Sequence, residues 1–422
     1  MNKIKLGDVL DFKRGMSVAG EFYSNEGRYV RLTLGNFTYP ECGFKFNTSK
    51  EDLYYTGTIR KEFIMKKGDI ITPLTEQVRG LLGNTATIPE DGLYIQTQDV
   101  AKVIPNETKI DKRFAYYLVS SPTVKKQLDA GSQQTKIRHT SPNKLKDCYA
   151  YLPELNTQKK IVKLLDSIKD KIETNNKINA ELESMAKTLY DYWFLQFEFP
   201  NEEGKPYKSS GGKMVWNEEL KREIPEGWTI RTVFDCSNVV SGYPFKTETY
   251  SNEGRYNIYT IGNVQDGYID DTCPNKIDFI PNDIDERCVL KPCDVIMSLT
   301  GNVGRVGIVY TKNALLNQRV LKVIPFDGYH NFLYLLFRNS SFMNVMQRIA
   351  SGTSQKNLSP NQVCDFTFAV PNKNLLDLFN LKLNGFIDAI VNNLSQNQEL
   401  TSLRDFLLPL LMNGQVTFKE ES

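Results

Sequence analysis

The chain carries one seven-residue stretch twice: Tyr23-Ser24-Asn25-Glu26-Gly27-Arg28-Tyr29 recurs letter for letter as Tyr250-Ser251-Asn252-Glu253-Gly254-Arg255-Tyr256. The match continues beyond this stretch, since Thr33, Gly35 and Asn36 return as Thr260, Gly262 and Asn263. Similarity that holds its register over a long distance is typical of a repeated structural unit. The sequence therefore predicts two like domains, an arrangement suited to a target with two parts.

The same register extends through both halves of the chain. The matched residues are Lys66 and Asp69 with Lys291 and Asp294, Gln98 and Lys102 with Gln318 and Lys322, Ser141-Pro142 with Ser359-Pro360, and Pro153 with Pro371. The offset between the copies shrinks along the chain, which places small insertions in loops of the first copy. Each copy therefore has the order of a globular part followed by a helix.

The length of 422 residues is enough for two ordinary domains with connecting elements. We expect a first globular domain at residues 1–152, a central helix at 153–199, a linker at 200–223, a second globular domain at 224–371 and a C-terminal helix at 372–422. The linker is expected to be flexible because residues 201–221 are polar and rich in Gly and Ser. Within the globular parts, residues 114–128 and 332–349 are each expected to be helical.

The two expected long helices carry heptad patterns. Residues 157–197 contain neither Pro nor Gly, and their pattern positions alternate in steps of four and three. The two series are Ile161, Leu165, Ile168, Ile172, Asn175, Asn179, Leu182, Ala186 and Leu189, and Phe379, Leu383, Phe386, Ile390, Asn393, Asn397, Leu400, Arg404 and Leu407.

Asparagine occupies matching positions near the middle of both series. A buried Asn in such a seam costs stability but fixes the register of the pair, and this is the role we expect for Asn175, Asn179, Asn393 and Asn397. We predict an antiparallel coiled coil in which these residues meet near the crossing. The alternative is that each helix packs on its own globular domain and the asparagines face water. The expected fold class is α+β, with two repeated mixed α/β domains joined by this helix pair.

The charge of the whole chain says little about a partner, since Lys and Arg number 52 and Asp and Glu 50. One segment is clearly basic: residues 125–146 carry six Lys or Arg residues, opposed only by Asp129. Such a segment indicates either a surface that contacts phosphates or a solvated helix face and loop.

Composition excludes several function classes. The seven cysteines lack paired spacing, which indicates a reducing cytoplasm and argues against a disulfide framework. His139 and His330 are the only histidines, so a histidine-rich metal or catalytic site is excluded. No stretch approaches the length of a transmembrane helix. We therefore expect a cytoplasmic protein with no metal or cofactor of its own, and the sequence offers no catalytic site.

Side chains suited to DNA lie in two pairs of related loops. The glycine-containing turns 75–83 and 300–307 each have an arginine, and such turns either approach a polyanion or close a tight hairpin. The loops 131–140 and 352–358 share Gln and Lys, which contact phosphates and base edges but are more commonly solvated. The candidate DNA contacts are Lys13, Arg14, Arg79, Gln133, Lys136, Arg138, Lys246, Arg305, Gln355, Lys356 and Asn357.

The whole chain resembles the DNA specificity (S) subunit of Type I restriction-modification systems. The resemblance rests on the repeated order of globular unit and Pro-capped long helix, and on the stretch Ile224-Pro225-Glu226-Gly227-Trp228. It also rests on residues 152–161, which are similar to the family's Pro-x-x-x-x-Gln-x-x-Ile helix entry through Pro153, Gln158 and Ile161. The second copy departs from this pattern, since Leu376 stands where the first copy has Gln158.

The resemblance implies a non-catalytic subunit whose two target recognition domains each read one half of a bipartite DNA sequence. It also implies docking of two methyltransferase subunits, which restriction and translocase subunits could join. S-adenosylmethionine, ATP and Mg are expected on those partners. A helix of ~30–40 residues spans ~45–60 Å, enough to separate two half-sites by a DNA turn of ~34 Å or more.

Two other functions remain open at this point. One is a specificity module of a related phage-defence methyltransferase system. The other is a scaffold that binds proteins rather than DNA, in which the helices act as a spacer between two protein-binding domains.

Overall fold

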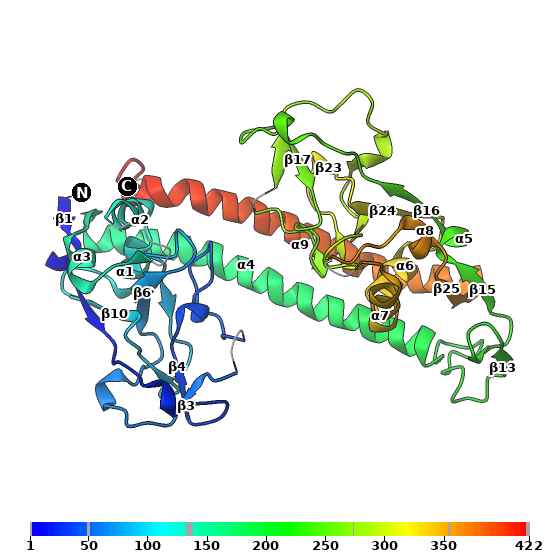
Figure 1. The fold of residues 1–422 in the computed structure, drawn as a ribbon, viewed down its shortest axis with the longest axis horizontal. Helices are drawn as coiled ribbons and strands as arrows, with labels where there is room; N and C mark the ends of the chain where they lie inside the picture. The colour runs from blue at the N-terminus through cyan, green and yellow to red at the C-terminus, as the bar shows by residue number, and fades with distance from the viewer. Residues whose placement is uncertain (1, 49–50, 132–137, 273, 353–354, 419–422) are drawn as a thin grey trace. The chain divides into compact units, whose positions relative to one another are not determined.

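The computed structural model describes residues 2–48, 51–131, 138–272, 274–352 and 355–418. The chain forms two compact units (Figure 1). The first consists of Met1–Asp170 together with Leu400–Ser422, and the second of Lys171–Glu399. Each unit is a mixed α/β domain to which segments of two long helices belong, and the expected α+β class is confirmed.

The globular part of the first unit contains three α-helices and twelve strands among its described residues. They are β1 (Asn2–Lys5), β2 (Leu10–Arg14), β3 (Tyr23–Ser24), β4 (Tyr29–Arg31), β5 (Tyr54–Tyr55), β6 (Ile70–Pro73), β7 (Thr75–Glu76), β8 (Ala86–Thr87), β9 (Tyr94–Ile95), β10 (Val100–Pro105), α1 (Lys112–Val119), α2 (Pro122–Ala130), β11 (Arg138–His139), α3 (Pro142–Asp147) and β12 (Tyr149–Leu152).

The central sheet of this unit has the strand order β2-β10-β6-β8. Its strands alternate side chains between two cores, as the period of two in a strand requires. Ala101 and Val103 of β10 belong to the core shared with α1 and α2, whereas Val100 joins the core beside the small sheet β3-β5-β4-β9. The central sheet is therefore buried on both faces, and its strand ends are the parts that reach the surface.

The globular part of the second unit repeats this plan with a five-stranded sheet of order β16-β24-β21-β22-β18. Its elements are β13 (Met214–Asn217), β14 (Arg222–Pro225), β15 (Thr229–Thr232), α5 (Val233–Cys236), β16 (Ser237–Ser241), β17 (Tyr256–Tyr259), β18 (Gly267–Tyr268), β19 (Asn275–Ile277), β20 (Val289–Leu290), β21 (Val295–Ser298), β22 (Val306–Ile308), β23 (Ala314–Leu316), β24 (Val320–Pro325), α6 (His330–Phe337), α7 (Ser340–Ile349), α8 (Pro360–Cys364) and β25 (Thr367–Val370).

Residues matched by the sequence register make matching contacts in the two units. Lys102 Nζ lies 2.7 Å from Asp69 Oδ2 in the first unit, and Lys322 Nζ lies 2.6 Å from Asp294 Oδ2 in the second. In both units the aspartate also accepts from the backbone N–H three residues before it. The two units therefore share these side-chain contacts as well as the matched residues.

The long helices are α4 (Leu155–Tyr190), which continues into a π-helical turn at Asp191–Leu195, and α9 (Lys373–Met412). Within the second unit, Asn175 Nδ2 donates to Asn397 Oδ1 at 2.9 Å, and Asn393 Nδ2 donates to Asn179 Oδ1 at 2.8 Å. Partner numbers fall along one helix as they rise along the other, so the helices run antiparallel over this stretch. Within the first unit, Leu411 and Met412 of α9 share a core with Ile161 of α4.

Three expectations about local structure are wrong. Residues 201–221 are not a flexible linker, because they include turns and strand β13, which pairs antiparallel with β14 just beyond the stretch. The Tyr207 ring stacks on Phe199 with centroids 4.6 Å apart, so apolar residues inside the polar stretch anchor it. The helix expected at 114–128 is two helices, because Ser121 caps a new helix whose first residue is Pro122. Likewise, residues 332–349 are divided between α6 and α7.

Candidate nucleic-acid interface

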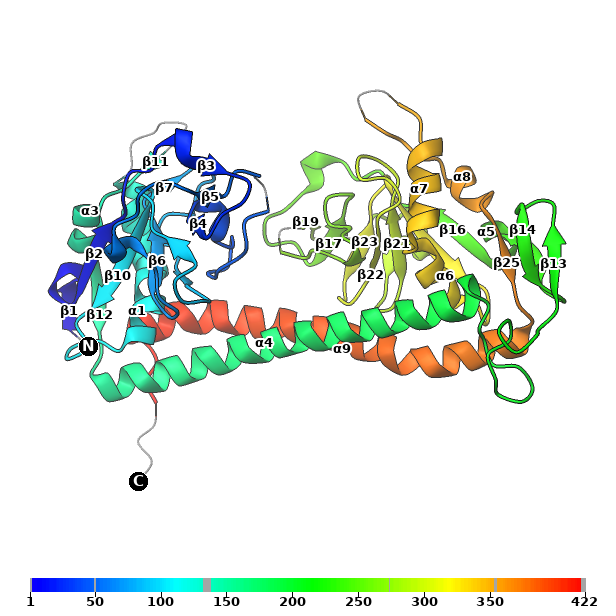
Figure 2. The ribbon, with the colours of Figure 1, turned by 90° about the horizontal axis from the view of Figure 1, so that it is seen from below.

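In the first unit, the ends of two strands meet at one edge of the central sheet. Arg14 and Thr72 both pair with Ala101 of β10, so β2 and β6 flank β10, run in the same direction and end at the same edge of the sheet. The chain leaves β2 through the exposed side chains of Lys13 and Arg14, and it leaves β6 into the loop of residues 74–85. Figure 2 shows β7 and β11 on the side of the unit away from its helix segments.

The two loops that the sequence singled out are joined at this edge. Strand β7 pairs with β11, which places Glu76 opposite Arg138 and Thr75 opposite His139. The backbone N–H of Thr140 also donates to the carbonyl of Leu74 at 2.8 Å. The loop after β6 and the loop before α3 therefore form one surface, although some sixty residues separate them in sequence.

A network of two carboxylates and two guanidinium groups fixes this surface. The carboxylate of Glu76 is buried, and its Oε2 accepts from the backbone N–H groups of Gly80 at 3.0 Å and Leu82 at 2.9 Å. Its Oε1 lies 3.0 Å from Arg138 Nη1, which also lies 2.7 Å from Asp129 Oδ1. Asp129 also accepts from Arg79: Nε donates to Oδ1 at 3.2 Å, and Nη2 donates to Oδ2 at 2.7 Å.

These guanidinium groups hold the pKa of the Asp129 carboxyl at about 2, with the hydrogen bond from Arg79 as the largest cause and that from Arg138 as the next. Asp129 is therefore ionised at any physiological pH. The same pair raises the pKa of Arg79. Both members remain charged, and the network has a fixed charge pattern.

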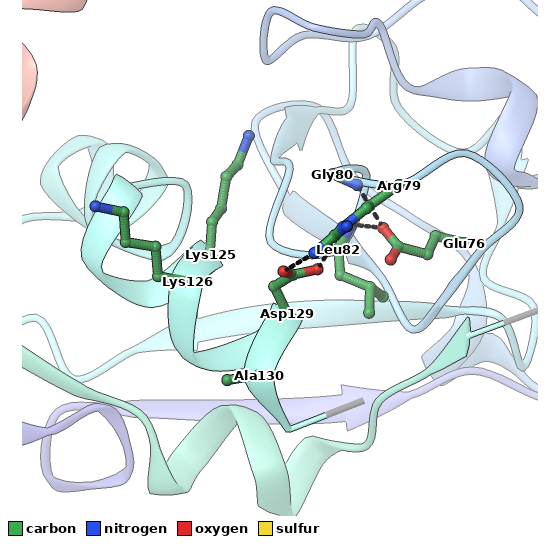
Figure 3. Close-up of a pocket in the computed structure, with 8 residues that line it drawn as sticks. All are labelled: Glu76, Arg79, Gly80, Leu82, Lys125, Lys126, Asp129 and Ala130. Atoms are coloured by element: carbon green, nitrogen blue, oxygen red, sulfur yellow. Dashed lines mark hydrogen bonds and ion pairs between the residues drawn. The ribbon is translucent and has the colours of Figure 1, made fainter. Parts of the chain in front are cut away.

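The network borders an open hollow of about 320 Å³ on the first unit (Figure 3). Arg79 lies alongside Asp129, while Lys125 and Lys126 project from α2. Lys125 Nζ is held by Asn84 Oδ1, whereas Lys126 is exposed. Because Glu76 and Asp129 already neutralise the two arginines, the two lysines leave this surface with a net positive charge suited to phosphate.

The second unit brings the equivalent loops together. Ser241 and Met297 both pair with Leu321, so β16 and β21 flank β24 and end at the same edge, as β2 and β6 do around β10. The loop after β21 contacts the loop after α7 through Gly301 N–H, which donates to the carbonyl of Lys356 at 3.1 Å. The N–H of Leu358 also donates to the carbonyl of Leu299 at 2.8 Å. The same edge therefore carries the same pair of loops in both units.

The candidate DNA contacts differ in how much of each side chain is available. Arg138, Lys356 and Asn357 bond within their own surroundings: Lys356 Nζ donates to the carbonyl of Gln347 at 2.8 Å, and Asn357 Oδ1 accepts from Thr300 Oγ1 at 2.9 Å. Arg305 Nη1 donates to Gln265 Oε1 at 2.8 Å. Lys13, Arg14, Arg79, Lys246 and Gln355 are exposed, as are Lys356 and Asn357 despite their bonds, and Arg14 Nε donates to the carbonyl of Gln98 at 2.9 Å. Gln133 and Lys136 lie outside the described residues.

Sequence reasoning missed three residues of this surface: Glu76, Asp129 and Tyr39. Tyr39 donates its hydroxyl to the carbonyl of Arg79 at 2.8 Å and keeps about half of its surface exposed. Asp129 gave one signal in the sequence, as the single acid inside a basic segment. No signal in the sequence indicated the role of Glu76, because its partners are backbone N–H groups and an arginine far along the chain.

Comparison with known proteins identifies the family. The family model for the Type I restriction modification DNA specificity domain matches residues 1–184 and 225–375, which is most of the chain and both globular parts. The chain belongs to this family. The match falls twice on one sequence, in agreement with the internal repeat.

Relatives and a solved structure agree with this assignment to the Type I specificity family. The chain is 22% identical over 409 residues to the Type I restriction enzyme HindI specificity subunit of Haemophilus influenzae, with 83% of the chain and 87% of the relative covered. It is 27% identical over 333 residues to the MjaIX specificity subunit of Methanocaldococcus jannaschii, covering 76% and 73%. The S subunit structure from M. genitalium has the same fold, with a TM-score of 0.54 at 16% identity over 97% and 96% of the two chains.

Two negative observations concern the described part of the chain. Its His, Cys, Asp and Glu residues form no group of three or more that could hold a metal ion. Its helices also include none that is long and apolar enough to span a membrane.

Proposed function

We propose that this Type I specificity subunit reads a bipartite DNA target, one half-site with each globular domain, and that it docks methyltransferase subunits. The observation that carries this proposal is the repeated edge: in both units two strands that flank a third end at the same edge of the sheet, and the same pair of loops meets there. Two copies of one reading surface on a single chain suit a target made of two separated parts.

The differences between the two edges support distinct half-sites. The first edge presents Arg79 paired with a carboxylate, whereas the second presents Arg305 bonded to the neutral amide of Gln265. The loop that carries Arg79 is also longer, since it runs from β7 to β8, while Arg305 directly precedes β22. Side-chain chemistry at base edges decides sequence, so the two domains are expected to read different bases.

Docking of a repeated partner is supported by exposed apolar side chains on both long helices. Met185 of α4 and Tyr192 of the π-helical turn that follows it are exposed in the second unit, and Leu403 and Phe406 of α9 are exposed in the first. The spacing that separates Asn175 from Asn393 also separates Met185 from Leu403. Large exposed apolar side chains at one repeated position mark a protein-binding surface, and one copy of a methyltransferase subunit would fit each.

In this account the chain performs no chemistry itself. S-adenosylmethionine would be bound by the methyltransferase subunits, and ATP and Mg by restriction and translocase subunits that join them. The specificity subunit contributes sequence choice and the distance between the two half-sites.

Selection of bound duplexes from a random pool tests this function. The full chain would be co-purified with its methyltransferase subunits, incubated with the pool, and the retained DNA sequenced. We expect two short fixed blocks separated by a spacer of constant length. Enrichment of a single block would contradict the bipartite reading, and a pool that stays random would contradict sequence specification altogether.

A further inference from the structure

We propose that Arg79 reads a guanine in the half-site of the first domain, and that Asp129 is the positioning residue that presents Arg79 to that base. The inference rests on the proposed function, because it assigns one residue of the reading surface to one kind of base pair.

The backbone that carries Arg79 is held from two sides. The buried carboxylate of Glu76 accepts from the N–H groups of Gly80 and Leu82, which close the turn just after Arg79. The carbonyl of Arg79 itself accepts from the Tyr39 hydroxyl at 2.8 Å. A β-carbon on Gly80 would lie 2.9 Å from that hydroxyl, so the glycine allows this close approach. These contacts therefore fix the position of the Arg79 backbone.

The side chain of Arg79 is also held, although 78% of it is exposed. Both oxygens of Asp129 bind it, one through Nε at 3.2 Å and one through Nη2 at 2.7 Å (Figure 3). Asp129 is itself held by Arg138, which the buried Glu76 anchors. An exposed ion pair contributes little to stability, so stability does not explain why Asp129 holds both Nε and Nη2 of one exposed arginine.

The geometry of the guanidinium group determines what Arg79 can still bind. Of its five N–H groups, one on Nε and one on Nη2 face Asp129, which leaves the edge formed by Nη1 and the second N–H of Nη2. This edge presents two parallel donors in one plane. Guanine offers two acceptors, O6 and N7, side by side in the major groove, and arginine binds them in a bidentate manner. The remaining edge of Arg79 matches that pair.

The other bases do not match this edge. Adenine presents an acceptor at N7 but a donor at N6, which would face an N–H of Arg79. Cytosine presents a donor and thymine an acceptor beside a methyl group, so neither offers two adjacent acceptors. A phosphate would accept from the same edge without regard to sequence, and this is the competing interpretation that an experiment must separate.

Among the described residues of the second domain, the equivalent loop after β21 does not repeat this arrangement. Arg305 donates through Nη1 to Gln265, so its end-on edge is already in use, and it lies at a different place in the loop. The prediction is therefore confined to one half-site. That asymmetry provides an internal control, because changes at Arg79 must leave the other half-site unaffected.

The test uses the full chain assembled with its methyltransferase subunits, and measures binding and methylation of duplexes that carry every single base-pair change in the wild-type target. We expect Arg79→Ala to weaken binding of the wild-type target by about 5- to 150-fold, the range of a lost bidentate contact. On the duplex whose relevant G·C pair is replaced by A·T, wild type and Arg79→Ala should bind equally. Arg79→Lys, which keeps the charge but loses the planar fork, should relax the preference at the same base pair.

Asp129→Asn should relax the preference at that single base pair too, because an amide cannot accept from both N–H groups of Arg79. A purely structural role would not move the preference at one position. The matched control is Arg60→Ala, since Arg60 is another exposed arginine of the first unit paired with a carboxylate, Glu62, at 3.3 Å. Arg60→Ala should leave the preference at every base pair of the target unchanged.

Three results would overturn the inference. Arg79→Ala could weaken every duplex by the same factor and reduce the salt dependence by about one phosphate contact, which would make Arg79 a phosphate ligand. The half-site affected could lack a G·C pair, or both half-sites could change together. If the wild-type complex itself selected no target, the proposed function would fail, and that arm alone would show it.

Discussion

Replacement of Gln158 by leucine tests why the first copy has a glutamine at the start of its long helix. The side chain is fully buried and joins three backbone groups. Its Oε1 accepts from the N–H of Asp111 at 2.8 Å, and its Nε2 donates to the carbonyls of Pro153 at 2.8 Å and Lys109 at 3.2 Å. Asp111 caps α1, so Gln158 ties the start of α4 to the start of α1.

The expected loss follows from these three hydrogen bonds. Leucine has nearly the same volume, so the change leaves little cavity. It does leave one backbone donor and two backbone acceptors without their hydrogen-bond partner. Each buried polar group left without a partner costs about 1–3 kcal/mol. Water can reach the groups of Lys109 and Asp111, which are not fully buried, so we expect a total of about 2–4 kcal/mol.

Urea titration followed by circular dichroism measures this loss in the full chain. The control is Gln98→Leu, because the side chain of Gln98 is exposed and makes no hydrogen bond among the described residues; its effect should stay within about 0.5 kcal/mol. A Gln158→Leu effect no larger than this control would refute the reasoning. The second copy has Leu376 at this position, so the same tie is not expected there.

Two further predictions concern docking and pH. Phe406→Glu should prevent co-purification of the methyltransferase, because docking would bury an unpaired carboxylate; retention at wild-type yield would contradict the docking surface. Burial raises the pKa of Asp271, although it accepts from Asn257 and Tyr259. A raised carboxyl pKa means that stability falls as pH rises above about 3.9. Asp271 Oδ2 also accepts from Gln398 Nε2, so asparagine at this position loses a hydrogen bond at every pH. The urea midpoint of Asp271→Asn, measured relative to wild type, should therefore be more favourable at pH 7 than at pH 3; a difference independent of pH would contradict this.

The sequence predicted those parts of the structure that depend on local pattern or on the repeat. The heptad steps predicted two long helices because a 3.5-residue period selects one helix face. The structure brings Asn175 and Asn397 together within the second unit. The repeat register predicted that Asp69 and Asp294 are equivalent, and their contacts agree. Pattern and register report on positions that neighbouring residues or a second copy constrain.

The parts that were missed depend on contacts between distant residues. Glu76 reads as an ordinary loop acid, and only the pairing of β7 with β11 places it beside Arg138. The stretch at 201–221 reads as a linker from composition, but the stacking of Tyr207 on Phe199 fixes it. The single helices expected at 114–128 and 332–349 ignored the capping residues Ser121 and Asn339. Side-chain type, by which the candidate contacts were chosen, likewise could not show that the Arg79 side chain is largely exposed and that of Arg138 largely buried.

A base-modification map of a host genome, with and without this chain and with its methyltransferase present in both, tests the central claim most directly. The account predicts that N6-methyladenine disappears from one split motif, made of two short half-sites with a fixed gap, when the chain is absent. An identical set of methylated motifs in both genomes would contradict a role in specifying DNA sequence.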